Sequence, residues 1–113
     1  MKLFRRPETI SAAETADRLA RGEVIAVDVR QDAEWKAGRI RGAVHIPLGR
    51  IANGQTGLSQ ATPVVTVCRS GHRSAFAART LRAAGFQVLN LDGGMKAWAR
   101  QGLPLEPDGG RIV

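Results

Sequence analysis

The sequence predicts an α/β fold in which a central, mostly parallel sheet is flanked by helices on both faces. Three runs rich in β-branched and other apolar residues, at 24–29, 64–67 and 87–91, are continuous enough to be strands covered on both sides. Segments with helical patterns separate them, and strands that alternate with helices are typical of a parallel sheet. A chain of 113 residues is long enough for one such domain with its own core.

The first third of the chain is predicted to hold two helices. Ser11 followed by Glu14 has the pattern of a capping box, so a helix is expected to begin after Ser11 and to end at Gly22. Asp32 is expected to cap a shorter helix that ends at Gly38.

A second short strand is predicted at 43–46, where Pro47 halts it. A helical turn at 48–52 and a loop at 53–57 follow.

The second half of the chain repeats the order of strand, loop and helix. An alanine-rich helix is predicted at 74–84, closed by Gly85. After the next strand, a turn at 92–94 is expected to lead into a last helix at 95–101.

The only cysteine, Cys68, lies where the strand at 64–67 ends. In open sheets of this kind, ligands bind beyond the carboxyl ends of the strands. Arg69 and Arg73 flank the short loop that follows, and Gly71 permits the backbone to turn N–H groups inward. Cations, backbone N–H groups and a helix N-terminus all lower the pKa of a thiol, and the thiolate is its reactive form. The loop therefore predicts a nucleophilic, anionic sulfur.

The alternative is an inert core residue, because free cysteine is among the most buried residue types. For Cys68 taken alone this alternative would be preferred, but an inert cysteine needs no cations around it, so Arg69, Gly71 and Arg73 favour a reactive site. His72 fits a solvent-facing position, an acid or base, or a substrate contact, and we favour the first.

Composition and charge narrow the class of function. The net charge is +7 and 14 of the 17 cations are arginine, which raises nucleic-acid binding as a hypothesis. Beyond Arg5 and Arg6 the arginines are scattered, tyrosine is absent and aromatic residues make up only 4%, so no base-stacking platform is expected. A basic surface of this kind instead draws small anions toward a cleft.

A single cysteine forms no internal disulfide and no cysteine pair for redox or metal chemistry. No segment has the apolar length of a signal peptide or a membrane span. We therefore expect a cytoplasmic protein that uses no metal or cofactor and binds neither nucleic acid nor membrane.

The loop Cys68-Arg69-Ser70-Gly71-His72-Arg73-Ser74 resembles the active-site loop of the rhodanese sulfurtransferases. Flanking segments resemble the other signatures of the family in the right order, namely Asp28-Val29-Arg30, residues 34–40, residues 42–47 and residues 91–104. The resemblance spans about residues 8–106, which implies one rhodanese domain over residues 1–113 with short tails at both ends.

Two positions depart from the family pattern. Arg39 stands where a histidine is usual, and His45 where an asparagine is usual. Both positions are expected to serve packing and loop anchoring rather than chemistry.

The resemblance implies persulfide chemistry at Cys68. The thiolate would take the sulfane sulfur from a small anionic donor such as thiosulfate and pass it to a thiophilic acceptor, either cyanide, a cellular thiol or a partner protein. Arg69 is the candidate for binding the donor, since a guanidinium presents a planar fork to oxyanions. Arg73 either binds the donor too or braces the loop. The remaining loop residues belong to the same site, and two residues outside it are expected to support the loop, Asp28 and Arg30.

Other functions on the same scaffold have weaker support. A carrier that delivers persulfide sulfur to a partner protein is the main alternative. In phosphatase-like relatives the loop between the cysteine and the arginine is one residue longer than in rhodaneses, which enlarges the pocket for phosphate or arsenate. Here four residues separate Cys68 from Arg73, the shorter loop length, which favours transfer of a single sulfur atom. The absence of a second cysteine also argues against an arsenate reductase that resolves its intermediate by an internal disulfide.

Overall fold

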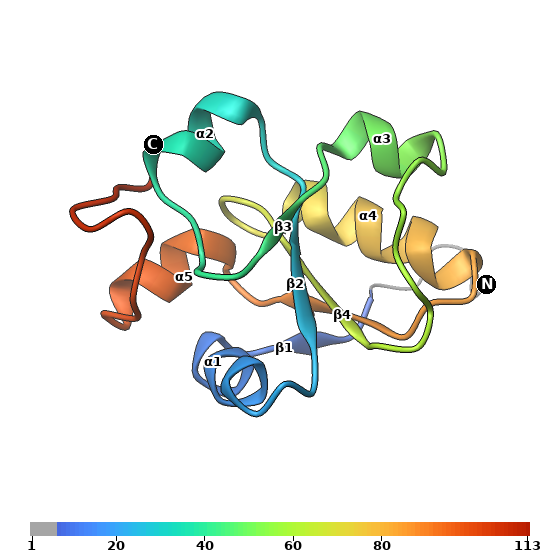
Figure 1. Ribbon diagram of the computed structural model, residues 1–113, viewed down its shortest axis with the longest axis horizontal. Coiled ribbons are helices and arrows are strands. Elements are labelled where there is room, and N and C mark those ends of the chain that lie inside the picture. The colour runs from blue at the N-terminus through green and yellow to red at the C-terminus, as the bar shows by residue number, and fades with distance from the viewer. Residues whose placement is uncertain (1–6) are drawn as a thin grey trace.

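The computed structural model describes residues 7–113, and within them five parallel strands form one sheet in the order β1-β5-β4-β2-β3 (Figure 1). This confirms the predicted parallel sheet. The short strand β1 was not predicted, because two residues carry no periodic pattern; it pairs with β5 at the edge of the sheet. The strands are β1 (Thr9–Ile10), β2 (Ile25–Asp28), β3 (Val44–His45), β4 (Val64–Val67) and β5 (Val88–Leu91).

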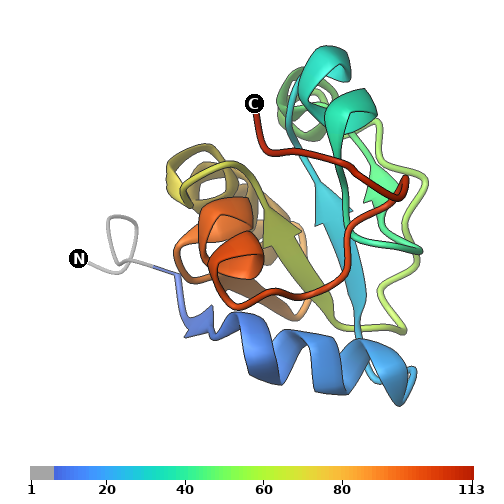
Figure 2. The ribbon, with the colours of Figure 1, turned by 90° about the vertical axis from the view of Figure 1, so that its left-hand side faces the viewer.

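Helices cover both faces of this sheet, as the sequence predicted (Figures 1 and 2). Helices α1 and α5 pack on one face over a core that includes Val65, Leu91 and Trp98. Helices α3 and α4 pack on the other face over a core that includes Val64 and Leu81. The helices are α1 (Ala12–Ala20), α2 (Asp32–Ala37), α3 (Leu48–Ala52), α4 (His72–Ala83) and α5 (Gly94–Arg100).

Two predicted helix starts were wrong in detail. Asp32 is the first residue of α2 rather than its cap; the cap position belongs to Gln31, whose N–H donates to the Glu34 carboxylate. Helix α4 begins at His72, two residues earlier than predicted, with Gly71 at its N-cap. Gly71 has a φ of 110°, a conformation that favours glycine. Because it caps the helix without a side-chain hydrogen bond, this helix start lacks the serine or aspartate that usually marks one in a sequence.

At α1 the Ser11 hydroxyl accepts a hydrogen bond from the Glu14 N–H, as the capping-box pattern predicted. The other half of the predicted capping box was wrong: the Glu14 carboxylate pairs with Arg18, one turn further along the helix, rather than with an N–H at the helix start.

The segment after α5 is packed against α2 rather than extending from the domain. Arg39 and Glu106 exchange two backbone hydrogen bonds, and the Arg111 N–H donates to the Ala37 carbonyl. In Figure 2 this segment, drawn in red, crosses the molecule and ends near α2 and the loop after β4. The predicted N-terminal tail, with Arg5 and Arg6, lies largely outside the described residues.

Across residues 7–113 no helix is long and apolar enough to cross a membrane. In the same part of the chain, no group of three or more His, Cys, Asp and Glu side chains is placed to hold a metal ion.

Candidate active site

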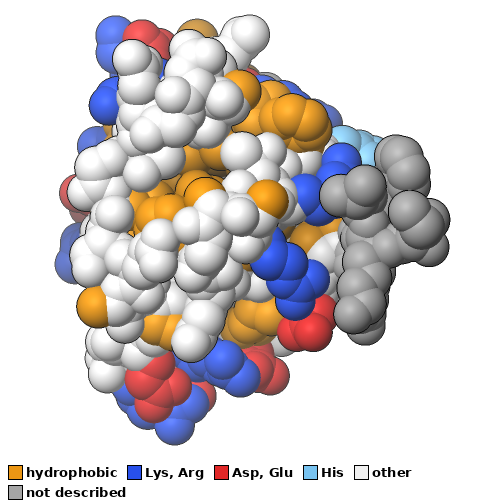
Figure 3. All heavy atoms as spheres, turned by 90° about the vertical axis from the view of Figure 1, so that its right-hand side faces the viewer, with side chains coloured by type: hydrophobic (Ala, Val, Ile, Leu, Met, Phe, Trp, Pro, Cys, Tyr) orange, Lys and Arg blue, Asp and Glu red, His pale blue; other side chains and the backbone are white. Residues whose placement is uncertain are grey.

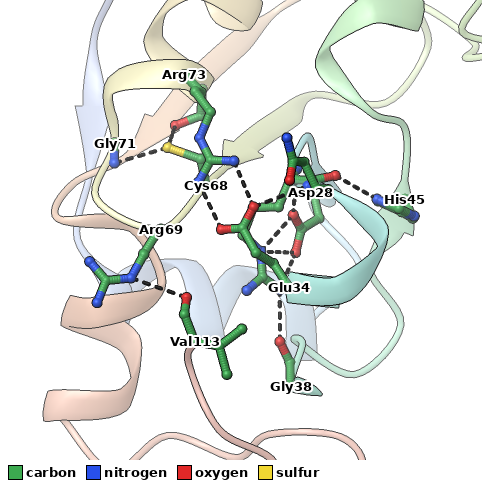
Figure 4. Close-up of polar contacts among 12 residues, drawn as sticks. Asp28, Glu34, Gly38, His45, Cys68, Arg69, Gly71, Arg73 and Val113 are labelled. Atoms are coloured by element: carbon green, nitrogen blue, oxygen red, sulfur yellow. Dashed lines mark hydrogen bonds and ion pairs between the residues drawn. The ribbon is translucent and has the colours of Figure 1, made fainter. Parts of the chain in front are cut away.

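Cys68 follows the last residue of β4, a strand that pairs with neighbours on both sides. Its side chain faces the α3 and α4 side of the sheet, and the residue is only 1% exposed. The loop from Arg69 to Gly71 then curls around the sulfur before α4 begins (Figure 4). The topology therefore places a lone thiol at the carboxyl edge of the sheet, under the start of a helix.

Two hydrogen-bond donors point at the sulfur. The Gly71 N–H lies 3.0 Å from Cys68 Sγ, and the Ser74 hydroxyl lies 3.2 Å from it. Burial raises the pKa of the Cys68 thiol, but hydrogen bonds from the Ser74 hydroxyl and from the backbone N–H groups of Ser74, Gly71 and Ser70 outweigh that effect. The pKa of Cys68 is therefore held below its usual value, which favours the thiolate.

The sequence attributed this lowering in part to the two arginines. The charges of Arg73 and Cys68 do attract each other, but neither guanidinium donates a hydrogen bond to the sulfur among the described residues. Arg73 lies in the first turn of α4 and forms a two-pronged ion pair with Glu34 of α2, at 2.7 and 2.8 Å. This pair raises the pKa of Arg73 and lowers that of Glu34. Of the two roles considered for Arg73, the geometry is that of a brace between helices.

Arg69 turns the other way, toward the C-terminal segment. Its Nε donates to the Val113 carbonyl at 3.2 Å, and the residue is exposed (Figure 4). Among residues 7–113 the guanidinium makes no other hydrogen bond, so its remaining N–H groups are available to an anion.

Asp28 and Arg30 form a fully buried ion pair beside the loop, with exposures of 1% and 0%. Arg30 Nε and Nη2 both donate to the carboxylate, and Nη2 also donates to the Gly38 carbonyl at 2.7 Å. Buried Nη1 has no hydrogen-bond partner among the described residues. The pair fixes the turn between β2 and α2, the helix that carries Glu34.

The two residues that depart from the family pattern, Arg39 and His45, both lie against the Trp35 ring. His45 stacks on Trp35 with ring centroids 4.7 Å apart, and the Arg39 guanidinium lies 5.1 Å from the centre of the same side chain. His45 Nε2 also contacts the Arg30 carbonyl at 2.7 Å. Both residues thus pack and anchor this region, as expected.

Helix α5 supports the loop from beneath. The Met95 N–H donates to the Cys68 carbonyl and the Lys96 N–H to the Arg69 carbonyl, at 2.8 and 3.0 Å. Gly94 allows this approach, because a Cβ there would lie 2.6 Å from the Arg69 carbonyl oxygen and closer still to that of Cys68.

A cleft of about 390 Å³ lies beside the loop, lined in part by Ser70, His72, Arg79 and Asp92. His72 is exposed, as favoured above, and its Nδ1 lies 3.3 Å from the Ser70 hydroxyl. Figure 3 shows a histidine at the edge of one face with basic side chains beside it and an acidic side chain nearby. Basic side chains close to a cleft attract small anions.

Sequence reasoning missed three residues of this site. Glu34 was part of a matching segment but was given no role, and Thr66 and Asn90 were treated as ordinary strand residues. A signal for the last two existed: each is a polar residue inside an otherwise apolar, buried strand, and such residues need hydrogen-bond partners.

Comparison with known proteins agrees with this geometry. A family model described as "Rhodanese-like domain" matches residues 11–101. A sulfurtransferase of Allochromatium vinosum is 41% identical over 103 residues, which cover 88% of this chain and 96% of that protein. The solved structure of a rhodanese-related protein from Thermoplasma volcanium superposes with a TM-score of 0.81 at 26% identity, and the alignment covers 87% of this chain and 96% of that one.

Other relatives are longer than this chain. A putative sulfur carrier protein of Bacillus subtilis, YrkF, is 40% identical over 73 residues, which cover 64% of this chain and 40% of that protein. An HTH-type transcriptional regulator of Mycobacterium tuberculosis, Rv0324, is 38% identical over 88% of this chain, and the alignment covers 45% of its length. The chain thus spans less than half of these two relatives.

Proposed function

This chain belongs to the rhodanese-like domain family, and from that membership we propose that Cys68 carries a sulfane sulfur, as a persulfide, from thiosulfate or a similar anion to a thiophilic acceptor. Relatives named as sulfurtransferases and as a sulfur carrier support sulfur transfer in general. The observation that carries the proposal is the sulfur of Cys68 held by the Gly71 N–H and the Ser74 hydroxyl at the end of β4.

The atoms and electrons of the proposed reaction balance without a cofactor. The Cys68 thiolate attacks the outer sulfur of thiosulfate, a new S–S bond forms, and the old S–S bond breaks with its electron pair leaving on sulfite. The carbon of cyanide, or the sulfur of an acceptor thiolate, then attacks the outer persulfide sulfur. The electron pair of that S–S bond returns to Cys68, which is again a thiolate.

The residues around the sulfur suit both steps. The first step begins, and the second step ends, with a negative charge on Cys68 Sγ, and between them the charge lies on the outer persulfide sulfur. The Gly71 and Ser74 donors are already oriented toward Sγ, so little reorganisation is needed to stabilise the thiolate. The exposed guanidinium of Arg69 would hold the oxyanion end of the donor. Arg73 would act on the reaction by bracing the loop through Glu34 and through its positive charge near Cys68.

The experiment is a turnover assay with thiosulfate and cyanide. The wild-type protein should form thiocyanate, and intact-mass analysis after thiosulfate alone should show a gain of one sulfur atom. The Cys68→Ser variant should show neither, while thermal unfolding confirms that it is folded. Thiocyanate formation by the variant at the wild-type rate would refute the proposal.

A second function, delivery of sulfur to a partner protein, is favoured by the likeness to a putative sulfur carrier protein and by the 1% exposure of Cys68. It predicts that Cys68 gains one sulfur but turns over slowly with cyanide and small thiols. Hydrolysis of a chromogenic phosphate ester would instead indicate a phosphatase on this scaffold.

A further inference from the structure

Two polar side chains lie beneath the active-site loop, each in a strand whose other residues are apolar. Thr66 of β4 and Asn90 of β5 are opposite each other in the parallel register of the two strands. Their exposures are 0% and 5%. In a strand, side chains two positions apart share a face, so Thr66 lies on the same face as Cys68.

Hydrogen bonding fixes how the Asn90 amide is oriented. One of its terminal atoms lies 3.0 Å from the Gly71 carbonyl oxygen, and the other lies 3.1 Å from the Thr66 hydroxyl. A carbonyl only accepts, so Nδ2 must face Gly71 and Oδ1 must accept the Thr66 proton. The Gly71 carbonyl therefore sets which way the amide faces, and the Thr66 hydroxyl holds its other end by donating to Oδ1.

Asn90 donates to Gly71, the same residue whose N–H points at the Cys68 sulfur. Gly71 accepts from Asn90 Nδ2 and from the Ala75 N–H, both at 3.0 Å, while its own N–H lies 3.0 Å from Cys68 Sγ. Gly71 has a φ of 110°, so its backbone conformation is one that few other residues adopt. A glycine has wide backbone freedom, and a hydrogen bond from a buried, rigid strand restricts it.

We propose that Asn90, held at its other end by the Thr66 hydroxyl, is a positioning residue that holds Gly71 with its N–H directed at the Cys68 sulfur. Neither residue touches the sulfur. They act through the glycine, by keeping one of the two nearest donors in place when the sulfur is charged. This role adds two supporting residues to the proposed sulfur transfer. It rests on that proposed function in one respect, namely that Cys68 is the reacting group.

A purely structural role for the pair makes a different prediction. Buried polar groups must be hydrogen-bonded in any case, and loss of such a bond lowers the free energy of unfolding wherever it occurs. A positioning role also changes the chemistry of the thiol. The reactivity of Cys68 therefore distinguishes the two roles.

The test uses variants of similar shape. Asn90→Leu removes the donor to Gly71, Thr66→Val removes the hydroxyl that holds Asn90 Oδ1, and Thr66→Ser retains that hydroxyl. Thr15→Val is the matched control, because Thr15 is also 0% exposed and its hydroxyl donates to a backbone carbonyl, that of Ser11 in α1.

The main readout is the rate of Cys68 alkylation by iodoacetamide as a function of pH, with thermal unfolding measured alongside. Asn90→Leu should move the pH midpoint upward and slow alkylation about three- to tenfold below that midpoint. Thr66→Val should do the same to a smaller extent, and Thr66→Ser should restore wild-type values. Thr15→Val should lower the unfolding temperature without moving the midpoint.

The proposal fails if Asn90→Leu and Thr66→Val lower the unfolding temperature as Thr15→Val does while the alkylation profile stays that of the wild type. Alkylation does not involve sulfur transfer, so this outcome is independent of the turnover assay. A protein that forms no thiocyanate but shows the predicted profiles would refute the proposed function and keep the positioning role.

Discussion

The Arg73 guanidinium meets the Glu34 carboxylate through two parallel hydrogen bonds, at 2.7 and 2.8 Å, and so ties the first turn of α4 to α2 (Figure 4). The residues are 39 positions apart in the chain. Because Arg73 lies five residues after Cys68, this ion pair fixes the position of the helix that begins above the sulfur.

Glu34→Gln should lower the free energy of unfolding by about 0.5–1 kcal/mol, a modest loss because Arg73 is 36% exposed. Arg73 lowers the pKa of Glu34 from its ordinary value of 4.5. The stabilisation is therefore fully present above pH 4.5 and is lost as the pH falls through the lowered pKa. Urea unfolding at pH 7 and at successively lower pH should show the wild-type and variant free energies converging. The control is Glu14→Gln, at an exposed pair on α1, and a difference that is constant with pH would contradict the prediction.

Ser74→Ala should raise the pKa of Cys68, because the Ser74 hydroxyl is the strongest of the groups that hold it down. The pH midpoint of alkylation should move upward, and the rate below it should fall about three- to tenfold. Ser70→Ala is the matched control, since the Ser70 hydroxyl contacts His72 rather than the sulfur. Equal shifts in the two variants would show that the hydroxyl contact to the sulfur is not the cause.

Arg30→Met should be strongly destabilising, by about 3–5 kcal/mol, because it leaves the Asp28 carboxylate buried without its counter-charge. The double variant Asp28→Leu, Arg30→Met should recover part of that loss, since no buried charge is left without a partner. Chemical unfolding of the two proteins measures the difference. A double variant less stable than Arg30→Met would mean that the hydrogen bonds from Arg30 matter more than the uncompensated charge.

Gly94→Ala should displace the active-site loop. A Cβ at this position would overlap the carbonyl oxygens of Cys68 and Arg69, which accept hydrogen bonds from α5. Gly102→Ala is the control, because Gly102 has a similar φ of 68° but nothing within 4 Å of its Cβ position. Its cost should be the backbone strain alone, about 1 kcal/mol. We expect Gly94→Ala to lose more stability than that and to alter the Cys68 alkylation profile; identical behaviour of the two variants would rule out the overlap.

Arg69→Ala should raise the KM for thiosulfate about tenfold or more, by removing a charge-assisted hydrogen bond to the donor. Alkylation by iodoacetamide, which is neutral, should stay near the wild-type rate. Arg50→Ala, at an exposed arginine on α3, controls for the loss of one positive charge. Equal effects of the two substitutions on KM would assign the result to net charge rather than to a bound donor.

The sequence predicted the centre of the sheet well because β2, β4 and β5 are buried on both faces and therefore carry nearly continuous apolar runs. The runs at β4 and β5 were placed to within a residue. The strand β1 escaped notice because its two residues form a strand only by pairing with β5. The start of α4 was misplaced because Gly71 caps it through its backbone conformation rather than through a side chain.

The sequence identified the cysteine and the loop around it, but not the residues from other parts of the chain that contact this loop. Cys68 and Gly71 were identifiable because the donor and the sulfur are three residues apart, so local sequence contains both. The hydrogen-bond partners of the two arginines could not be identified in this way. Glu34 is 39 residues from Arg73, and Val113 is 44 residues from Arg69. An arginine side chain is long enough to reach partners that only the tertiary fold brings near.

The supports of the loop come late in the chain, and this has a consequence for protein synthesis. Asn90, Met95 and Lys96 contact the loop from 19 to 27 positions beyond the residues they hold. A chain synthesised only as far as α4 lacks those three residues, so the loop is without three of its hydrogen bonds. The loop conformation that surrounds the sulfur is therefore complete only after the last strand and the last helix have been made.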